Sequence, residues 1–110
     1  MTKEWLLDAG FETLAIREGL STGSEQEHSD PIYATSSFVF DSAEEAAATF
    51  SGEREGNTYS RFSNPTVSVF EKRLAAMESG EEGVATSSGM SAILTLCLTV
   101  LRSGDHVVCS

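Results

Sequence analysis

The sequence predicts an α/β fold on three observations. A well-capped helix occupies the region 64–80, and an apolar run at Val84–Ser87 turns through Ser-Gly into a second, strongly apolar helix. A further apolar run begins at Asp105. Strand, helix and strand at this spacing form a βαβ unit with parallel strands and a right-handed crossover. Because a parallel sheet is buried on both faces, we expect the chain to be the front part of a larger α/β protein.

The first forty residues are expected to combine a short helix with irregular chain. Phe11, Leu14 and Ala15 share one face of a helix, with Ile16 beside them. Residues 18–30 are rich in Gly, Ser and acidic residues without periodicity, which indicates a loop or extended arm. The β-branched and aromatic residues of 31–40 favour extended chain.

The second helix is predicted over 43–50. Ser42 and Glu45 fit a capping box at its start, and Gly52 ends it. A polar loop over 53–63 follows.

The third helix has the strongest boundary signals. Asn64 is the expected cap, Pro65 takes the first helical position, and Gly80 is expected to end the helix. An apolar stripe on this helix indicates packing against a core; its residues are Val67, Phe70, Leu74 and Met77.

The fourth helix follows the turn Ser87-Ser88-Gly89-Met90-Ser91. Its broad apolar face is made of Met90, Ile93, Leu94, Cys97, Leu98 and Leu101, and Gly104 is expected to end it. A strand-to-helix turn leaves backbone N–H groups unpaired, and these donors with the helix dipole favour an anion such as phosphate. Taken alone this signal is weak, because many such turns contain Ser and Gly and bind nothing.

Charge and composition exclude several classes of function. Seven basic against seventeen acidic residues give a net charge of −10, which argues against nucleic acid as a partner. The start of the chain does not have the pattern of a signal peptide, and the apolar stretch of 93–101 is too short to span a bilayer. We therefore expect a cytoplasmic protein with no membrane partner. Cys97 and Cys109 lack companions at metal-ligand spacing, so buried free thiols and no metal site are expected.

Three segments together resemble one enzyme family: Tyr59-Ser60-Arg61, Asn64-Pro65-Thr66 and Ser88-Gly89-Met90. They are similar to the Cys/Met-metabolism family of pyridoxal-phosphate enzymes, over about Phe11 to Ser110. The resemblance is strongest to the O-succinylhomoserine sulfhydrylase branch, on the segments Thr35–Phe40 and Ala85–Ile93.

The resemblance implies a fold and a cofactor site. Residues 1–63 would form an N-terminal arm with short helices and an inter-subunit loop. Residues 64–110 would begin the cofactor-binding domain, with the first βαβ unit of a fold-type I (aspartate aminotransferase-like) large domain. The residues implied to bind the phosphate of pyridoxal 5'-phosphate are Tyr59, Arg61, Ser88, Gly89 and Met90. Tyr59 and Arg61 would reach this phosphate across an interface, from a neighbouring subunit. The protein is accordingly expected to be a homo-oligomer, namely a homotetramer.

The resemblance also implies an activity for the whole protein. It would make homocysteine from an acylated homoserine and sulfide, in methionine biosynthesis. Cystathionine γ-synthase, cystathionine γ-lyase and methionine γ-lyase are the alternatives within the family, and a non-catalytic interaction module is the alternative of another class. Lys3 and Lys72 do not match the Schiff-base lysine, which is expected beyond Ser110. The 110-residue chain alone is therefore expected to bind the cofactor weakly and to be inactive.

Overall fold

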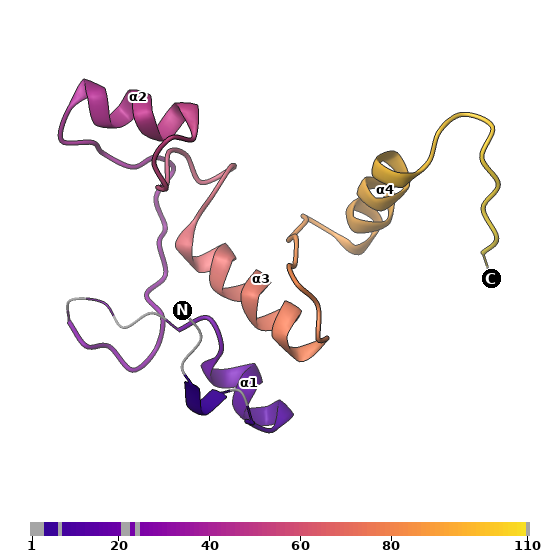
Figure 1. Cartoon of the computed structure of the whole chain (residues 1–110), viewed down its shortest axis with the longest axis horizontal. Coiled ribbons are helices and arrows are strands. Elements are labelled where there is room, and N and C mark those ends of the chain that lie inside the picture. Colours follow the sequence, from indigo (N-terminus) through magenta and orange to yellow (C-terminus); the bar gives the residue numbers. More distant parts are fainter. Residues whose placement is uncertain (1–3, 7, 21–22, 24, 110) are drawn as a thin grey trace.

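The computed structural model describes residues 4–6, 8–20, 23 and 25–109. In these residues the chain forms a short 3-10 helix and four α-helices, arranged as in Figure 1. Their bounds are η1 Glu4–Leu6, α1 Phe11–Arg17, α2 Ala43–Ser51, α3 Pro65–Met77 and α4 Gly89–Val100. The Cα radius of gyration is 17.4 Å, larger than the roughly 13 Å of a compact domain of this length.

The expected βαβ unit is not formed among the described residues. Their strand pairing is one isolated antiparallel bridge, between Ser37 and Tyr59. Residues 84–87 and 105–109 are not paired with each other, and Figure 1 shows the chain after α4 leading away from the chain before it. A parallel strand is held by hydrogen bonds to neighbouring strands, and neither segment has such a neighbour here. For the same reason Cys109 is exposed and Cys97 half-buried, although both were expected to be buried.

The chain packs best where α1 lies against α3 (Figure 1). Gly19, two residues after the end of α1, has a φ of +76° and lies against the backbone of α3. A Cβ built on Gly19 would be 3.2 Å from the carbonyl oxygen of Val69. The buried apolar residues among those described are Leu6 and Ala75, so the core is small.

The second helix confirms the expected capping. The Ser42 hydroxyl accepts a hydrogen bond from the backbone N–H of Glu45 (3.1 Å). The Glu45 carboxylate accepts one from the N–H of Asp41 (2.8 Å), one residue before the Ser42 N–H that the expected capping box would use. The pKa of Glu44 is lowered, because its carboxylate accepts from its own backbone N–H and from Ser42. Gly52 takes the left-handed conformation that ends the helix.

The third helix starts as expected and ends differently. Asn64 caps it and Pro65 is its first residue. The helix ends at Met77, and the left-handed residue is Ser79 (φ +54°) instead of Gly80. Gly80 instead donates its N–H to the carbonyl of Ala75 (2.8 Å), which satisfies one of the unpaired carbonyls at the helix end.

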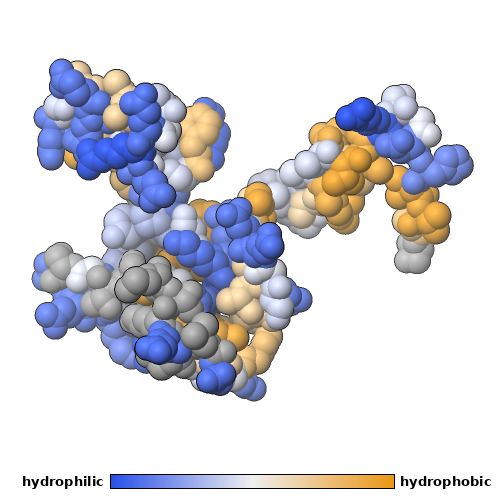
Figure 2. All heavy atoms as spheres, in the orientation of Figure 1, coloured by the Kyte–Doolittle hydropathy of each residue, from blue (hydrophilic) through white to orange (hydrophobic). Residues whose placement is uncertain are grey.

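The fourth helix exposes apolar side chains over more than half of its circumference. The side chains more than half exposed are Met90, Ile93, Leu94, Leu96, Leu98 and Val100. Figure 2 shows this apolar surface over α4 and the chain that follows it. The helix ends at Val100, and Gly104 (φ +101°) lies in the turn after it, beyond the helix end. Ser91, Thr95 and Thr99 occupy the remaining face, so the helix has one narrow hydroxyl-bearing stripe and a broad apolar surface. Such a broad apolar surface is typical of a helix buried in a larger protein.

Candidate functional site

The turn into α4 leaves backbone donors available. The Ser88 hydroxyl accepts a hydrogen bond from the N–H of Ser91 (3.1 Å), and the Ser88 carbonyl accepts the first intrahelical bond, from Ala92 (3.0 Å). The N–H groups of Gly89 and Met90 belong to the first turn, where a helix supplies no acceptor. The start of α4 therefore presents adjacent N–H groups at the positive end of the helix dipole.

Gly89 keeps the approach to these donors open. A Cβ built on Gly89 would meet no atom within 4 Å. The first turn of α4 contains no acidic residue that would repel an anion. This set of donors fits a phosphate group, and hence the phosphate of pyridoxal 5'-phosphate.

The loop before α3 holds Tyr59 and Arg61 against each other. The guanidinium carbon of Arg61 lies 5.4 Å from the centre of the Tyr59 ring and 5.3 Å from that of Phe62. Tyr59 and Phe62 meet edge to face, with ring centres 6.4 Å apart. Stacking on two rings orients the guanidinium without using its hydrogen-bond donors. Among the described residues, no carboxylate lies within ion-pair distance of Arg61, so its charge is free to meet an anion.

The two groups of predicted site residues are not brought together within one chain. In Figure 1 the loop from α2 to α3 lies near α2, whereas α4 lies beyond the other end of α3. No hydrogen bond joins the two groups in the part of the chain that is described. The assignment of Tyr59, Arg61, Ser88, Gly89 and Met90 to a shared phosphate site stays a prediction.

Asn64 has a second role that sequence analysis missed. It is a buried polar residue, with 6% of its surface exposed. Its Oδ1 caps α3 by accepting from Thr66 N–H (2.9 Å), while its Nδ2 donates to the Tyr33 carbonyl and to the Ser60 hydroxyl, both at 3.0 Å. The available signal was the asparagine amide itself, because a cap uses its acceptor and leaves its N–H groups unpaired.

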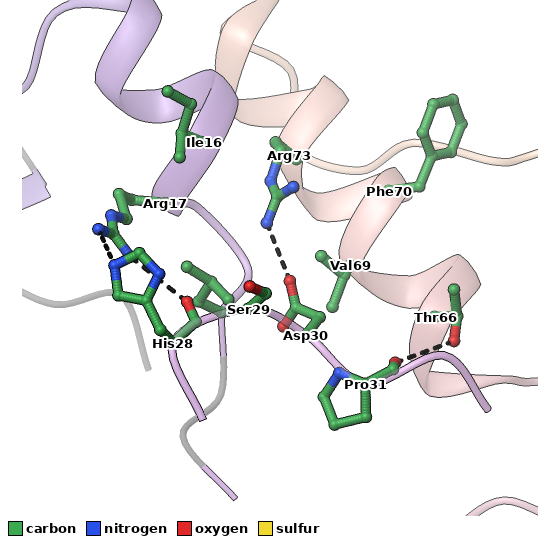
Figure 3. Close-up of a pocket in the computed structure, with 11 residues that line it drawn as sticks. Ile16, Arg17, His28, Ser29, Asp30, Pro31, Thr66, Val69, Phe70 and Arg73 are labelled. Carbon is green, nitrogen blue, oxygen red and sulfur yellow. Dashed lines mark hydrogen bonds and ion pairs between the residues drawn. The ribbon is translucent and has the colours of Figure 1, made fainter. Parts of the chain in front are cut away.

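A groove of about 440 Å³ lies where α1, residues 28–31 and α3 meet (Figure 3). Arg73 Nη2 lies 3.1 Å from Asp30 Oδ2, and its Nε donates to the Glu18 carbonyl (2.9 Å). Arg17 Nη2 lies 2.6 Å from Nε2 of His28. Because Arg73 is paired with Asp30 and Arg17 is hydrogen-bonded to the His28 ring, the groove is a junction that holds Glu18 and residues 28–31 against the helices. Its lining is Ile16, Arg17, Leu20, His28, Ser29, Asp30, Pro31, Thr66, Val69, Phe70 and Arg73.

The described residues contain no group of three or more His, Cys, Asp or Glu side chains placed to hold a metal ion. None of the helices described is both long and apolar enough to cross a membrane.

Several known proteins are similar to this chain in sequence. O-succinylhomoserine sulfhydrylase of Pseudomonas aeruginosa is 50% identical over 118 aligned positions, which cover 100% of this chain and 29% of that protein. L-methionine gamma-lyase of Fusobacterium nucleatum is 48% identical, over 90% of this chain and 25% of that protein. The chain thus spans less than a third of the length of these relatives.

A solved structure matches as well. A crystal structure described as an O-acetylhomoserine (thiol)-lyase of Campylobacter jejuni superposes with a TM-score of 0.81 at 37% identity. The match covers 89% of this chain and 24% of that one, which contains N'-pyridoxyl-lysine-5'-monophosphate at its position 205. The family model for Cys/Met metabolism PLP-dependent enzymes matches residues 12–110. With nearly its whole length matched, the chain belongs to the Cys/Met metabolism family of enzymes that depend on pyridoxal 5'-phosphate.

Proposed function

We propose that the complete protein is an O-succinylhomoserine sulfhydrylase, which makes homocysteine from O-succinylhomoserine and sulfide. The observation that carries the proposal is the open pair of N–H groups at the start of α4, in a chain 50% identical along its whole length to such an enzyme. Pyridoxal 5'-phosphate, when bound, would supply the electron sink for a replacement at Cγ, in which the Cγ–O bond breaks, succinate leaves and sulfide forms the new Cγ–S bond.

The residues of this chain bind and orient the phosphate in the proposed site. The N–H groups of Gly89 and Met90 donate to the phosphate, and Ser88 holds the turn that presents them. The guanidinium of Arg61 donates two parallel hydrogen bonds to the phosphate, and the hydroxyl of Tyr59 donates one. Both side chains act in the phosphate site of a neighbouring subunit.

Magnitudes show why this part needs the rest of the enzyme. A hydrogen bond to a charged group contributes about 1.5–3 kcal/mol, and a helix terminus about 0.3–2 kcal/mol. Micromolar binding requires roughly 8 kcal/mol after ordering costs. The lysine, the ring contacts and the substrate contacts must therefore come from elsewhere in the complete protein.

The proposal includes the architecture of the complete protein. Residues 84–87 and 105–109 would pair as parallel strands of a fold-type I large domain, which would cover the apolar surface of α4. Residues 1–63 would serve as the arm and inter-subunit loop, and residues 64–110 as the start of the cofactor domain. The assembly would be a homotetramer in the cytoplasm, where Cys97 and Cys109 stay reduced.

The second candidate is γ-elimination of methionine, which the 48% identity to L-methionine gamma-lyase favours. The complete protein should be assayed with O-succinylhomoserine and sulfide, with O-acetylhomoserine and sulfide, and with methionine alone. The proposal expects homocysteine from the succinyl ester with the highest kcat/KM. A higher kcat/KM for methionine, with release of a thiol and a 2-oxo acid, would establish the second candidate instead.

A further inference from the structure

We propose that Asn64 is a positioning residue of the phosphate site, acting with Ser60 as a clasp that fixes the loop carrying Tyr59 and Arg61. The inference rests on the proposed function, because it assumes that this loop meets the cofactor phosphate. It assigns to Asn64 a role beyond capping α3.

The clasp joins two segments that are distant in sequence, residues 33–36 and residues 60–64. Asn64 Nδ2 donates to the carbonyl of Tyr33 and to the hydroxyl of Ser60. The Ser60 hydroxyl in turn donates to the carbonyl of Thr35, and the Ser60 N–H donates to the carbonyl of Ser36 (2.9 Å). The loop is thus attached to residues 33–36 on one side and to the start of α3 on the other.

Ser60 lies between the two residues whose side chains are proposed to meet the phosphate. Residues 60–62 form a turn, closed by hydrogen bonds from the N–H groups of Phe62 (2.9 Å) and Ser63 (3.1 Å) to the Tyr59 carbonyl. Within this turn the Arg61 guanidinium lies 5.4 Å from the centre of the Tyr59 ring, and both side chains are exposed. Fixing Ser60 therefore fixes the turn that carries the phenol and the guanidinium.

Backbone hydrogen bonds attach this loop to residues 36–38, from Ser60 N–H to the Ser36 carbonyl and from Phe38 N–H to the Thr58 carbonyl (3.2 Å). Tyr59, Arg61 and Phe62 are all exposed, so side-chain packing contributes little to their placement. A bidentate guanidinium contact depends on both distance and angle, and a less fixed loop must be ordered at the moment of binding. Asn64 is the buried member of the clasp, and its amide is the side-chain donor that ties Ser60 to Tyr33 and to the start of α3.

The chain offers variants that separate clasping from capping. Asn64→Asp keeps the oxygen that caps α3, since aspartate is a good cap, but removes both N–H donors. Ser60→Ala removes the hydroxyl without adding charge, and Ser60→Thr restores it. Asn57→Asp is the matched control in the same loop, because the Asn57 side chain has no hydrogen-bond partner among the described residues.

The experiment titrates the apo form of the complete protein with pyridoxal 5'-phosphate and, separately, with pyridoxal, which lacks the phosphate. We expect Asn64→Asp and Ser60→Ala to raise the dissociation constant of pyridoxal 5'-phosphate about tenfold and to change that of pyridoxal less than twofold. Ser60→Thr and Asn57→Asp should remain within twofold of the wild type for both ligands. The double variant Asn64→Asp with Ser60→Ala should lose little more than either single variant, because both remove one clasp.

Equal weakening of both ligands would overturn the inference, because the effect would then not act through the phosphate. Unchanged cofactor binding in both Asn64→Asp and Ser60→Ala would also overturn the inference. The same holds if the losses of affinity are fully additive in the double variant, or if the wild type binds pyridoxal 5'-phosphate and pyridoxal equally well. If Asn64→Asp does not fold, Ser60→Ala alone decides. These titrations need no turnover, so a protein that passes them but does not act on acylated homoserine would contradict only the proposed function.

Discussion

Arg73 and Asp30 form an ion pair between α3 and the segment before Pro31, with Arg73 Nη2 3.1 Å from Asp30 Oδ2. Both side chains are largely covered, at 25% and 18% exposed. Figure 3 shows this pair from α3 to Asp30. The same guanidinium donates through Nε to the Glu18 carbonyl, so one side chain of α3 contacts both Glu18 and Asp30.

Breaking this pair should loosen the arm. Asp30→Asn or Arg73→Gln in the complete protein should lower the free energy of unfolding by about 1–3 kcal/mol, between the values for exposed and buried pairs. Hydrogen exchange of the amides in 18–31 should accelerate at the same time. Arg54→Gln is the control, because Arg54 pairs with Glu45 while 57% exposed, and its loss should cost less than about 1 kcal/mol. Equal losses for the two pairs would contradict the importance given to Arg73.

Ser88 should separate helix capping from anion binding. Ser88→Ala loses the bond to Ser91 N–H and should lower stability by about 1 kcal/mol. Ser88→Asp keeps the cap and places a negative charge where the phosphate is proposed. We expect it to retain wild-type stability in urea unfolding but to raise the dissociation constant of pyridoxal 5'-phosphate at least tenfold. Unchanged cofactor affinity in Ser88→Asp would place the phosphate elsewhere.

A side chain at position 89 should not destabilise the apo protein but should weaken binding of the cofactor. Because a Cβ at Gly89 meets open space, Gly89→Ala should leave the melting temperature of the apo protein within a few degrees of the wild type. The added methyl group should nevertheless hinder a phosphate lying on the N–H groups, and cofactor affinity should fall.

Gly19→Ala is the opposite case and serves as its comparison. Its positive φ and the nearby Val69 carbonyl should make the alanine variant unfold more readily, by about 1–3 kcal/mol. Cofactor affinity in the surviving folded protein should be unchanged. A Gly89→Ala variant that is destabilised as much as Gly19→Ala would show that the start of α4 is packed.

Arg61 should depend on its shape as well as its charge. Arg61→Lys keeps the positive charge but loses the planar fork and the stacking on Tyr59 and Phe62. We expect affinity for pyridoxal 5'-phosphate to fall roughly tenfold in Arg61→Lys and roughly a hundredfold in Arg61→Ala, as charged hydrogen bonds are lost. Affinity for pyridoxal should change little in either variant. Equal affinity of the wild type and Arg61→Ala for the phosphorylated cofactor would remove Arg61 from the site.

Local signals predicted the helices well. Ser42, Asn64 and Ser88 each accept a backbone N–H of the first turn, as the residue types at those positions indicated. The C-terminal ends of the helices were harder to predict, because the residue that takes the left-handed conformation depends on local hydrogen bonds as well as on the position of glycine. Ser79 takes that conformation although Gly80 follows it. Among the predicted site residues, the structure contains the contact between Tyr59 and Arg61 and the capped turn at Ser88. It does not bring these two groups together at one phosphate site.

The amino-acid sequence by itself determined the helices, their starts and the family, because caps, periodicity and motifs act over a few residues. Tertiary structure alone decided that Arg73 reaches Asp30 and that Asn64 reaches Tyr33, since nothing local links residues 43 and 31 positions apart. It also decided the strands: their hydrogen bonds come from neighbouring strands, so an apolar run becomes a paired strand only beside a partner.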